Sequence, residues 1–124
     1  MPTLLVFRDP KKIPGATIKP IVAQLPSIVA RNLSCDHPDG HLEPEDVSVR
    51  VFDNGEYDLN VPDLGLVLFA NEYPERLIDF EERKERIREA LVIAVADHPT
   101  KIECSVWSLL AQGAYALFEH VPKK

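Results

Sequence analysis

The chain has 124 residues, 45% of them hydrophobic, which is the size of one domain with a core of its own. Its net charge of −6 argues against nucleic acid or an anionic membrane as a partner, because phosphate groups are bound by basic faces. The sequence shows neither a membrane span nor a secretory signal, and two cysteines are too few for a disulfide framework, so we expect a cytoplasmic protein.

The chain opens with a short strand and a longer helix. Residues 3–7 form an apolar run that is typical of a buried strand. From Thr17 to Val29, apolar residues recur at the spacing of one helix face. Thr17 can cap this helix and Pro20 fits its first turn, whereas Pro26 should kink the helix or shorten it.

Two further strands are predicted on either side of a turn. Residues 47–52 alternate between a face of valines and a face of Ser48, Arg50 and Phe52, as in a half-buried strand. The polar residues after them carry turn chemistry. Residues 64–70 are a continuous apolar run, which indicates a strand covered on both faces.

The rest of the chain predicts a second helix, a fourth strand and an apolar tail. After a loop that reads Asn-Glu-Tyr-Pro-Glu-Arg, a helix begins at Asp79, which has capping-box spacing to Glu82, and ends at His98. Residues 101–110 are the last long strand. The apolar residues beyond them need another surface to cover them.

The order of elements is β-α-β followed by β-α-β, and the two halves resemble each other. An apolar run begins at Pro2 and a similar run begins at Pro62, an offset of 60 residues (62 minus 2). We therefore expect one α+β domain of two pseudo-repeated units, about 1–58 and 59–124, which form a four-stranded mixed sheet with two helices on one face. Because Arg50 and Phe52 do not suit open water together, the other face should meet further subunits or a ligand.

Pro2 is the first candidate for chemistry. The small residue behind Met1 favours removal of the methionine, and Pro2 would then present a secondary amine at the start of a strand. An α-amino group has a pKa of about 7.7–8.0, and an apolar pocket or nearby cations lower that value. A neutral amine held by a rigid ring is a usable general base near neutral pH. The alternative is a proline without function, as in many proteins.

Arg50 is the second candidate, because it stands mid-strand on the face opposite three valines. A guanidinium is a planar fork that binds a carboxylate through two hydrogen bonds. The alternative for Arg50 is a surface or interface salt bridge in an acidic protein.

An initial Met-Pro strand, a helix and a strand reading Ser-Val-Arg-Val together resemble the tautomerase superfamily, which includes 4-oxalocrotonate tautomerase and the macrophage migration inhibitory factor-like proteins. Short members are a single β-α-β unit, and longer members fuse two units into a chain of about this length. The resemblance implies an isomerase without metal or organic cofactor, assembled as a homotrimer, whose substrate is a small 2-oxo or enol carboxylic acid.

The resemblance also assigns roles to residues. It implies that Pro2 moves the proton and that Arg50, in the Ser-Val-Arg-Val strand, binds the substrate carboxylate. A further arginine of the family follows its first strand. Here that loop has Lys11 and Lys12 instead, and Arg76 occupies the comparable loop of the second half.

An aromatic residue from the second half often closes the pocket in this family. Trp107 and Tyr115 are the candidates here, although Trp107 also fits a place in the core. Metal-ligand residue types gather in residues 35–41, but Pro38 and Gly40 disfavour a helix there, so an exposed loop is the simpler interpretation.

Two other functions stay open. The same proline serves in relatives that hydrate or dehalogenate their substrates by activating water. The same fold also suits an oligomeric binding protein without catalysis, which retention of Met1 would favour because it blocks the amine.

Overall fold

The computed structural model describes residues 2–112 and 116–123. The elements follow the predicted order β-α-β-β-α-β, with two short helices added. Their bounds are β1 Thr3–Arg8, α1 Gly15–Leu33, the 3-10 helix η1 Pro44–Asp46, β2 Ser48–Asp53, β3 Leu64–Asn71, α2 Pro74–Leu77, α3 Phe80–Ala94 and β4 Cys104–Ala111.

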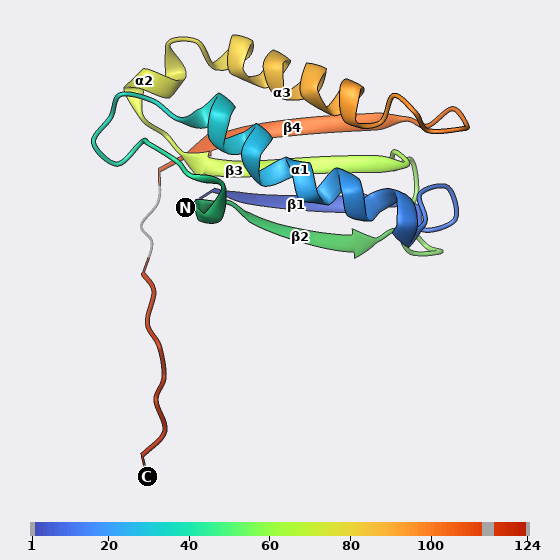
Figure 1. The fold of residues 1–124 in the computed structure, drawn as a ribbon, viewed down its shortest axis with the longest axis horizontal. Helices are drawn as coiled ribbons and strands as arrows, with labels where there is room; N and C mark the ends of the chain where they lie inside the picture. The colour runs from blue at the N-terminus through green and yellow to red at the C-terminus, as the bar shows by residue number, and fades with distance from the viewer. Residues whose placement is uncertain (1, 113–115, 124) are drawn as a thin grey trace.

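The four strands form one mixed sheet in the order β2-β1-β3-β4 (Figure 1). β1 and β3 lie antiparallel at its centre, with Thr3 opposite Phe69. β2 runs parallel to β1, and β4 runs parallel to β3. Each half of the chain therefore contributes one parallel pair, and the two pairs point in opposite directions. The predicted four-stranded mixed sheet is confirmed.

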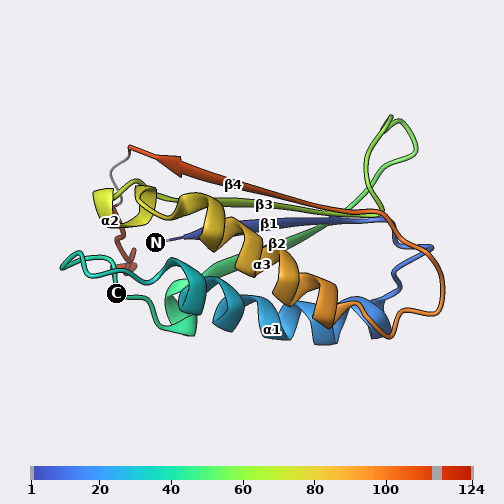
Figure 2. The ribbon, with the colours of Figure 1, turned by 90° about the horizontal axis from the view of Figure 1, so that it is seen from above.

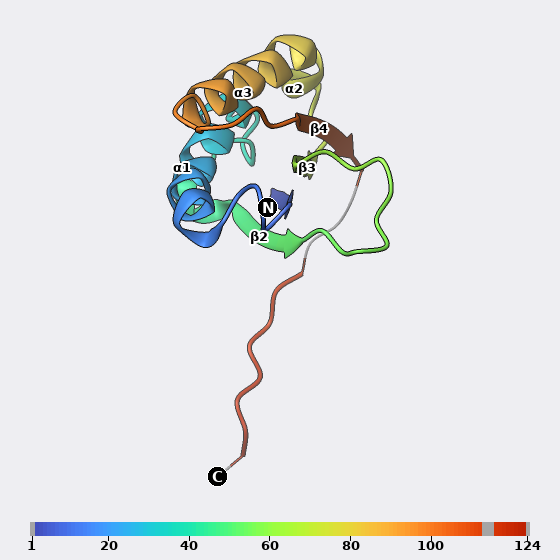
Figure 3. The same cartoon turned by 90° about the vertical axis from the view of Figure 1, so that its right-hand side faces the viewer.

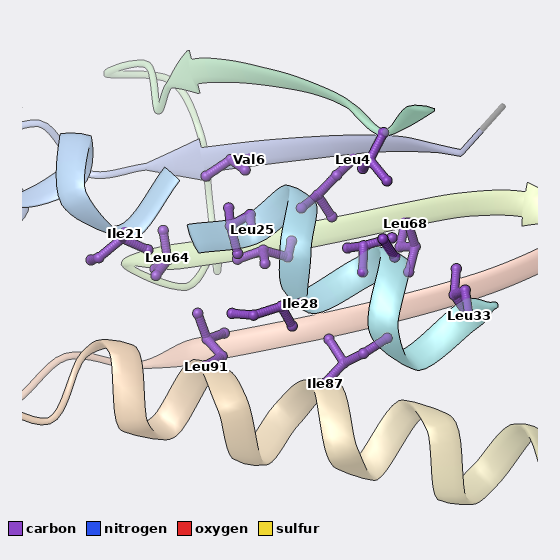
Figure 4. Close-up of a cluster of buried hydrophobic side chains, with 14 of the residues drawn as sticks. Leu4, Val6, Ile21, Leu25, Ile28, Leu33, Leu64, Leu68, Ile87 and Leu91 are labelled. Carbon is purple, nitrogen blue, oxygen red and sulfur yellow. The ribbon is translucent and has the colours of Figure 1, made fainter. Parts of the chain in front are cut away.

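Both long helices cover the same face of the sheet (Figures 2 and 3). Ile28 of α1 meets Ile87 and Leu91 of α3 in the core between the helices and the strands (Figure 4). No helix in the described ranges is long and apolar enough to cross a membrane. The strands complete the core with alternate residues, namely Leu4, Val6, Leu64, Leu66 and Leu68.

α1 is longer than its prolines predict. Its N-cap residue is Pro14, whose carbonyl accepts a hydrogen bond from the backbone N–H of Thr17 at 2.9 Å. The helix begins at Gly15, so Thr17 is not its cap and Pro20 lies inside it rather than in its first turn. Pro26 does not shorten the helix either. An interior proline costs about 3 kcal/mol, and burial of the apolar stripe on both sides of it offsets this cost.

The segment before α3 forms a helical turn of its own. Residues Pro74–Leu77 are α2, where the sequence predicts a loop. α3 ends before the predicted end at His98. The predicted capping box at Asp79 is not formed, because its carboxylate accepts a hydrogen bond from Arg83 Nε at 2.6 Å and makes no cap bond.

β2 alternates between two sides as its sequence predicts, but this edge strand is less buried than predicted, with Val51 40% exposed. The parallel register places Val49 beside Leu4 on the helix side and Arg50 beside Leu5 on the opposite side. β3 differs from its prediction, because the helices cover one face whereas Phe69 is 41% exposed on the other. The apolar run 64–70 is therefore covered on one face of the sheet and not on both within a single chain.

The face of the sheet opposite the helices, which we call the outer face, is open in the single chain. Phe52 stacks on Phe7 of the neighbouring strand, with ring centroids 5.3 Å apart. Among residues of the described strands, Arg50 is the one charged side chain that the register places on this face. The large apolar side chains that remain 39–65% exposed on it are Phe52, Phe69, Trp107 and Leu109.

Asp63 holds the end of the sheet that is far from the amino terminus. Its Oδ2 accepts a hydrogen bond from the backbone N–H of Glu103 at 2.9 Å, and its Oδ1 lies 3.1 Å from Lys12 Nζ. Its own carbonyl accepts a hydrogen bond from the N–H of Asp9 at 2.8 Å. The Glu103 N–H, and to a lesser degree Lys12, keep the pKa of the Asp63 carboxyl below its ordinary value of 3.8.

We expect Asp63→Asn to lower the free energy of unfolding at pH 7 by up to about 1 kcal/mol, because the ion pair lies near the surface. A lowered pKa in the folded state stabilises the fold above the ordinary pKa, and this stabilisation is lost as the pH falls through the folded-state value. The difference between wild type and variant should therefore shrink below about pH 4. Urea unfolding at both pH values measures it, with Asp39→Asn in an exposed loop as control. A difference that grows on acidification would contradict this role.

Candidate active site

Pro2 lies immediately before β1, at the entry to the central strand pair. The start of a strand is where a missing N–H costs least, which explains why a proline can open a buried strand. Its carbonyl accepts a hydrogen bond from the backbone N–H of Ser48 at 3.0 Å, which joins it to the start of β2. The residue is buried. The sheet itself therefore positions the Pro2 ring, and no mobile loop has to be ordered.

The surroundings of Pro2 are apolar. Continuing the register of both neighbouring strands puts Val47 and Ala70 beside it, and each is 7% exposed. Strand alternation puts the ring on the same side as Leu4, which faces the helices. Such surroundings favour the neutral form of an amine, because burial disfavours its charge. The nitrogen becomes an amine only after Met1 has been removed.

Arg50 lies on the other side of the sheet. It stands in the middle of β2, is exposed, and pairs with Leu5. Because Pro2 shares its face with Leu4 and Arg50 shares its face with Leu5, the sheet separates the two side chains. One chain therefore does not bring the predicted base and the predicted carboxylate-binding residue together.

Arg76, in α2, lies at the same end of the sheet as the amino terminus (Figure 1). Its side chain is only 2% exposed. Nε donates a hydrogen bond to the carbonyl of Leu33 (2.8 Å), Nη1 donates to that of Asn71 (2.9 Å), and Nη2 donates to that of Gly40 (3.5 Å). These contacts give Arg76 a structural role. Its binding of substrate stays a prediction that the geometry of one chain does not favour.

Two arginines hold the carboxyl end of α1. Besides the bond from Arg76 to Leu33, Arg83 Nη1 donates hydrogen bonds to the carbonyls of Asn32 (3.0 Å) and Ser34 (2.9 Å). The last carbonyls of a helix lack partners within the helix, and its dipole favours cations there. Burial lowers the pKa of the Arg76 guanidinium, which still stays charged at neutral pH.

The side chains around Arg76 form a cluster that the sequence analysis did not predict. The rings of His37 and Tyr73 stack with centroids 4.0 Å apart and planes 10° apart. Arg76 Cζ lies 4.8 Å from the centroid of the Tyr73 ring, and the thiol of Cys35 is close enough to act on the Arg76 pKa. The cluster joins two loops that are distant in sequence, so no local spacing could reveal it.

Trp107 lies on the outer face of β4 and is 65% exposed, so the interpretation of this residue as core is wrong. It pairs with Val67 of β3, on the side of the sheet opposite Pro2. Within one chain it does not approach the predicted base. The other predicted aromatic residue, Tyr115, lies outside the described residues.

The loop 35–41 forms a compact turn. The backbone N–H of Cys35 donates to the carbonyl of Gly40 (3.0 Å), and the N–H of Gly40 donates to that of His37 (2.8 Å). In the described ranges 2–112 and 116–123, no group of three or more His, Cys, Asp or Glu side chains is placed to hold a metal ion.

A hollow of about 410 Å³ lies between α3 and β4, and it contains none of the predicted site residues. Its lining combines apolar side chains with charged side chains of α3. It is lined by Lys84, Glu85, Arg88, Leu91, Val92, Val95, Ile102, Cys104 and Val106.

Comparison with known proteins identifies the fold. No protein-family model matches the sequence, and no curated protein matches it significantly. One similar solved structure is a 5-carboxymethyl-2-hydroxymuconate isomerase from Deinococcus radiodurans R1, with a TM-score of 0.59, 14% identity, and coverage of 91% of this chain and 83% of that one. Another is a fused 4-OT described as a symmetric trimer (TM-score 0.58, 11% identity, 89% and 85% covered). The chain has the tautomerase superfamily fold.

This fold is shared with proteins of more than one activity. A malonate semialdehyde decarboxylase, described with decarboxylase and hydratase activities, has a TM-score of 0.53 and 14% identity to this chain, with 95% of this chain and 91% of that one covered. The resemblance that rests on the Met-Pro and Ser-Val-Arg-Val segments is thus confirmed as a likeness of fold. The tautomerase fold alone does not select among these reactions.

We expect Arg76→Met to lower the free energy of unfolding by at least about 2 kcal/mol, because it leaves buried carbonyls without donors. Urea unfolding of the full chain measures the change. The matched control is Arg86→Met, whose exposed guanidinium lies 3.5 Å from Glu82 on the same helix and should change stability by less than about 0.5 kcal/mol. Equal stabilities of the two variants would contradict the structural role of Arg76.

Proposed function

We propose that this protein is a tautomerase-like isomerase that acts on a small 2-oxo or enol carboxylic acid, with Pro2 as its general base. The observation that carries the proposal is a buried proline at the entry to the central strand pair of a tautomerase fold. The similar isomerase, named for a hydroxymuconate, supports an acid of this class as the substrate. The proposal includes no metal or organic cofactor.

The proposed reaction moves one proton. The Pro2 nitrogen takes it from the carbon next to the oxo group. The electron pair of that C–H bond forms a C=C bond, and the π pair of the C=O bond moves to the oxygen, which gives an enolate. The proton then returns to another atom of the substrate. The apolar neighbours Val47 and Ala70 keep the amine neutral enough to act as this base.

Arg50 is the proposed carboxylate-binding residue. Its guanidinium can hold the substrate carboxylate through two hydrogen bonds, and its charge stabilises the enolate as that charge develops. Since Arg50 and Pro2 lie on opposite sides of one sheet, we propose that each site takes Arg50 from a neighbouring copy. A homotrimer would supply such neighbours, and the symmetric trimer of the fused 4-OT supports that stoichiometry.

The setting we propose is the cytoplasm. Cys35 and Cys104 are both free thiols, and a reducing compartment keeps thiols in that state. The net charge of −6 argues against nucleic acid as a partner. The partners we propose are a small carboxylate substrate and further copies of this chain.

A hydratase or decarboxylase that uses the same proline is the second candidate function. The observation that favours it is the similarity to the malonate semialdehyde decarboxylase, which is described with both activities. The two candidates differ in product, because the isomerase returns the proton to the substrate whereas the hydratase adds water.

We expect Pro2→Ala to lower kcat/KM for phenylenolpyruvate or 2-hydroxymuconate by about 100-fold or more, the usual contribution of a positioned general base. N-terminal mass spectrometry confirms removal of Met1 in both proteins. Pro62→Ala is the matched control, because Pro62 precedes β3 but its nitrogen is an amide, and this variant should keep the wild-type rate. Equal rates of wild type and Pro2→Ala would show that Pro2 is not the base. An inactive wild type would favour the binding protein.

We expect Arg50→Ala to raise KM more than it lowers kcat, with a loss in kcat/KM of about 10- to 100-fold, because the substrate loses a charge-assisted hydrogen-bond pair. Arg50→Lys keeps the charge but not the fork and should recover part of the loss. Steady-state kinetics on both variants measures the effect. An unchanged KM in Arg50→Ala would remove this residue from the site.

A further inference from the structure

The hollow between α3 and β4 corresponds to a place in the first half of the chain that is covered. β4 pairs with β3 as β2 pairs with β1, so Cys104 stands beside Leu64 as Val49 stands beside Leu4. Both leucines are buried on the helix side of the sheet. The place that corresponds to the hollow therefore lies between α1 and β2.

In the first half, the connection between helix and strand supplies apolar side chains at this place. It has 14 residues (34–47) and includes η1. Its residues Leu42 and Val47 belong to the core and are 9% and 7% exposed. The N–H of Leu42 donates a hydrogen bond to the hydroxyl of Ser34 at 3.0 Å, which holds the turn in position. The chain thus covers this space by itself.

In the second half, the connection is shorter and leaves the space open. It has nine residues (95–103), and its large aliphatic residues are Val95 and Ile102 at its two ends. Both line the hollow and are only partly buried. The residues between them read Ala-Asp-His-Pro-Thr-Lys, so none of them supplies a side chain like that of Leu42.

Hydrogen bonds fix this shorter connection. His98 Nε2 donates to the carbonyl of Lys12 at 2.9 Å, which ties the middle of the connection to the loop after β1. The N–H of Glu103 donates to Asp63 Oδ2 at 2.9 Å, which ties its end to the start of β3. The hollow is therefore formed without a ligand, as small-molecule sites usually are.

The charges in the lining favour an anion. Lys84 and Arg88 stand against Glu85, an excess of one positive charge (two minus one) in a chain whose net charge is −6. Lys84 pairs with Glu81, and Arg88 pairs with Glu85, but their side chains stay 39% and 54% exposed. Exposed ion pairs contribute little, so a ligand carboxylate can take hydrogen bonds from these two cations.

The charge also differs along the hollow. α3 ends at the end of the sheet where β4 begins (Figure 1), so the cations of α3 lie away from Cys104. Burial and, to a lesser degree, the carboxylates of Asp63 and Glu103 raise the pKa of the Cys104 thiol. A ligand carboxylate is therefore favoured beside Lys84 and Arg88, and the apolar part of the ligand is favoured beside the uncharged thiol.

We propose that this hollow binds an unbranched aliphatic carboxylate of about ten carbons, with its carboxylate at Lys84 and Arg88 and its chain extending toward Cys104. The volume of about 410 Å³ sets the size. At about 30 Å³ for a group the size of water, it holds about a dozen non-hydrogen atoms, as in decanoate. The chain would cover Val92, which is 52% exposed.

This inference goes beyond the proposed function. The hollow contains none of the residues proposed for the isomerase site. Its ligand is held by an apolar chain and one carboxylate, and no bond of the ligand is made or broken.

The first test is isothermal titration calorimetry of the full chain with decanoate. We expect one site per chain with a Kd below about 1 mM. Arg88→Met should raise this Kd by about five- to tenfold, because a charge-assisted hydrogen bond is lost, and should leave the affinity for 1-decanol unchanged. The matched control is Arg86→Met on the same helix, because Arg86 lines a different hollow, with Arg31 and Ile93, and should not change the Kd.

The second test locates the ligand through the two free thiols. Iodoacetamide labelling at pH 8.5, followed by mass spectrometry, measures both, and the alkaline pH offsets the raised pKa of Cys104. Decanoate at ten times its Kd should slow the labelling of Cys104 by about tenfold. The labelling of Cys35, in the loop at the other end of the sheet, should not change. Cys104→Phe fills the hollow and should abolish binding, with circular dichroism to confirm the fold.

Four results would overturn the proposal: no heat of binding up to 1 mM decanoate, equal protection of Cys35 and Cys104, Arg88→Met with wild-type affinity, or loss of binding in Arg50→Ala, which would place decanoate in the proposed substrate site. None of these readouts depends on catalysis. An inactive Pro2 would therefore leave the outcome for the hollow unchanged, and an empty hollow would leave the proposed reaction unchanged.

Discussion

The carboxyl end of α1 is where the two halves of the chain depend on each other most directly. Arg76 and Arg83 come from the second half, and they donate to the carbonyls of Asn32, Leu33 and Ser34 at the end of a helix from the first half. These carbonyls have no partners within the helix, and burying them unpaired would cost more than the bonds themselves contribute. The same Arg76 guanidinium also donates hydrogen bonds to the carbonyls of Asn71 and Gly40, so it connects the helix end with the end of β3 and with the loop 35–41. These hydrogen bonds lie at the same end of the sheet as Pro2.

Periodicity predicts most of the fold because the core follows it. The helical stripe of α1 reappears as a buried face, and the alternation in residues 47–52 reappears as the two sides of β2, of which Val47 is buried and Val49 half-buried on the helix side. Predictions at element ends were less successful. Pro26 lies within a helix because the stripe continues beyond it, and Asp79 gives its carboxylate to Arg83 instead of the helix end. In both cases a tertiary contact outweighs a local rule.

The candidate residues could be named from the sequence one by one, but their arrangement in space could not be predicted. Pro2 and Arg50 can be picked out from the sequence because the strands that carry them can be predicted from it. The two side chains lie on opposite faces of the sheet because Leu5 pairs with Arg50. The register between two strands cannot be predicted from the sequence of either strand alone. Arg76 is buried by carbonyls that arrive from distant segments, so its loop position gave no sign of its partners. Trp107 is exposed because it belongs to a face that one copy leaves uncovered.

Pro62 precedes β3 much as Pro2 precedes β1, but the chain runs on through it, and its carbonyl accepts a hydrogen bond from Asn54. A chain with two β-α-β units still has a single amino terminus. Under the proposed chemistry, the number of reactive centres in an assembly therefore equals its number of chains, not its number of repeats.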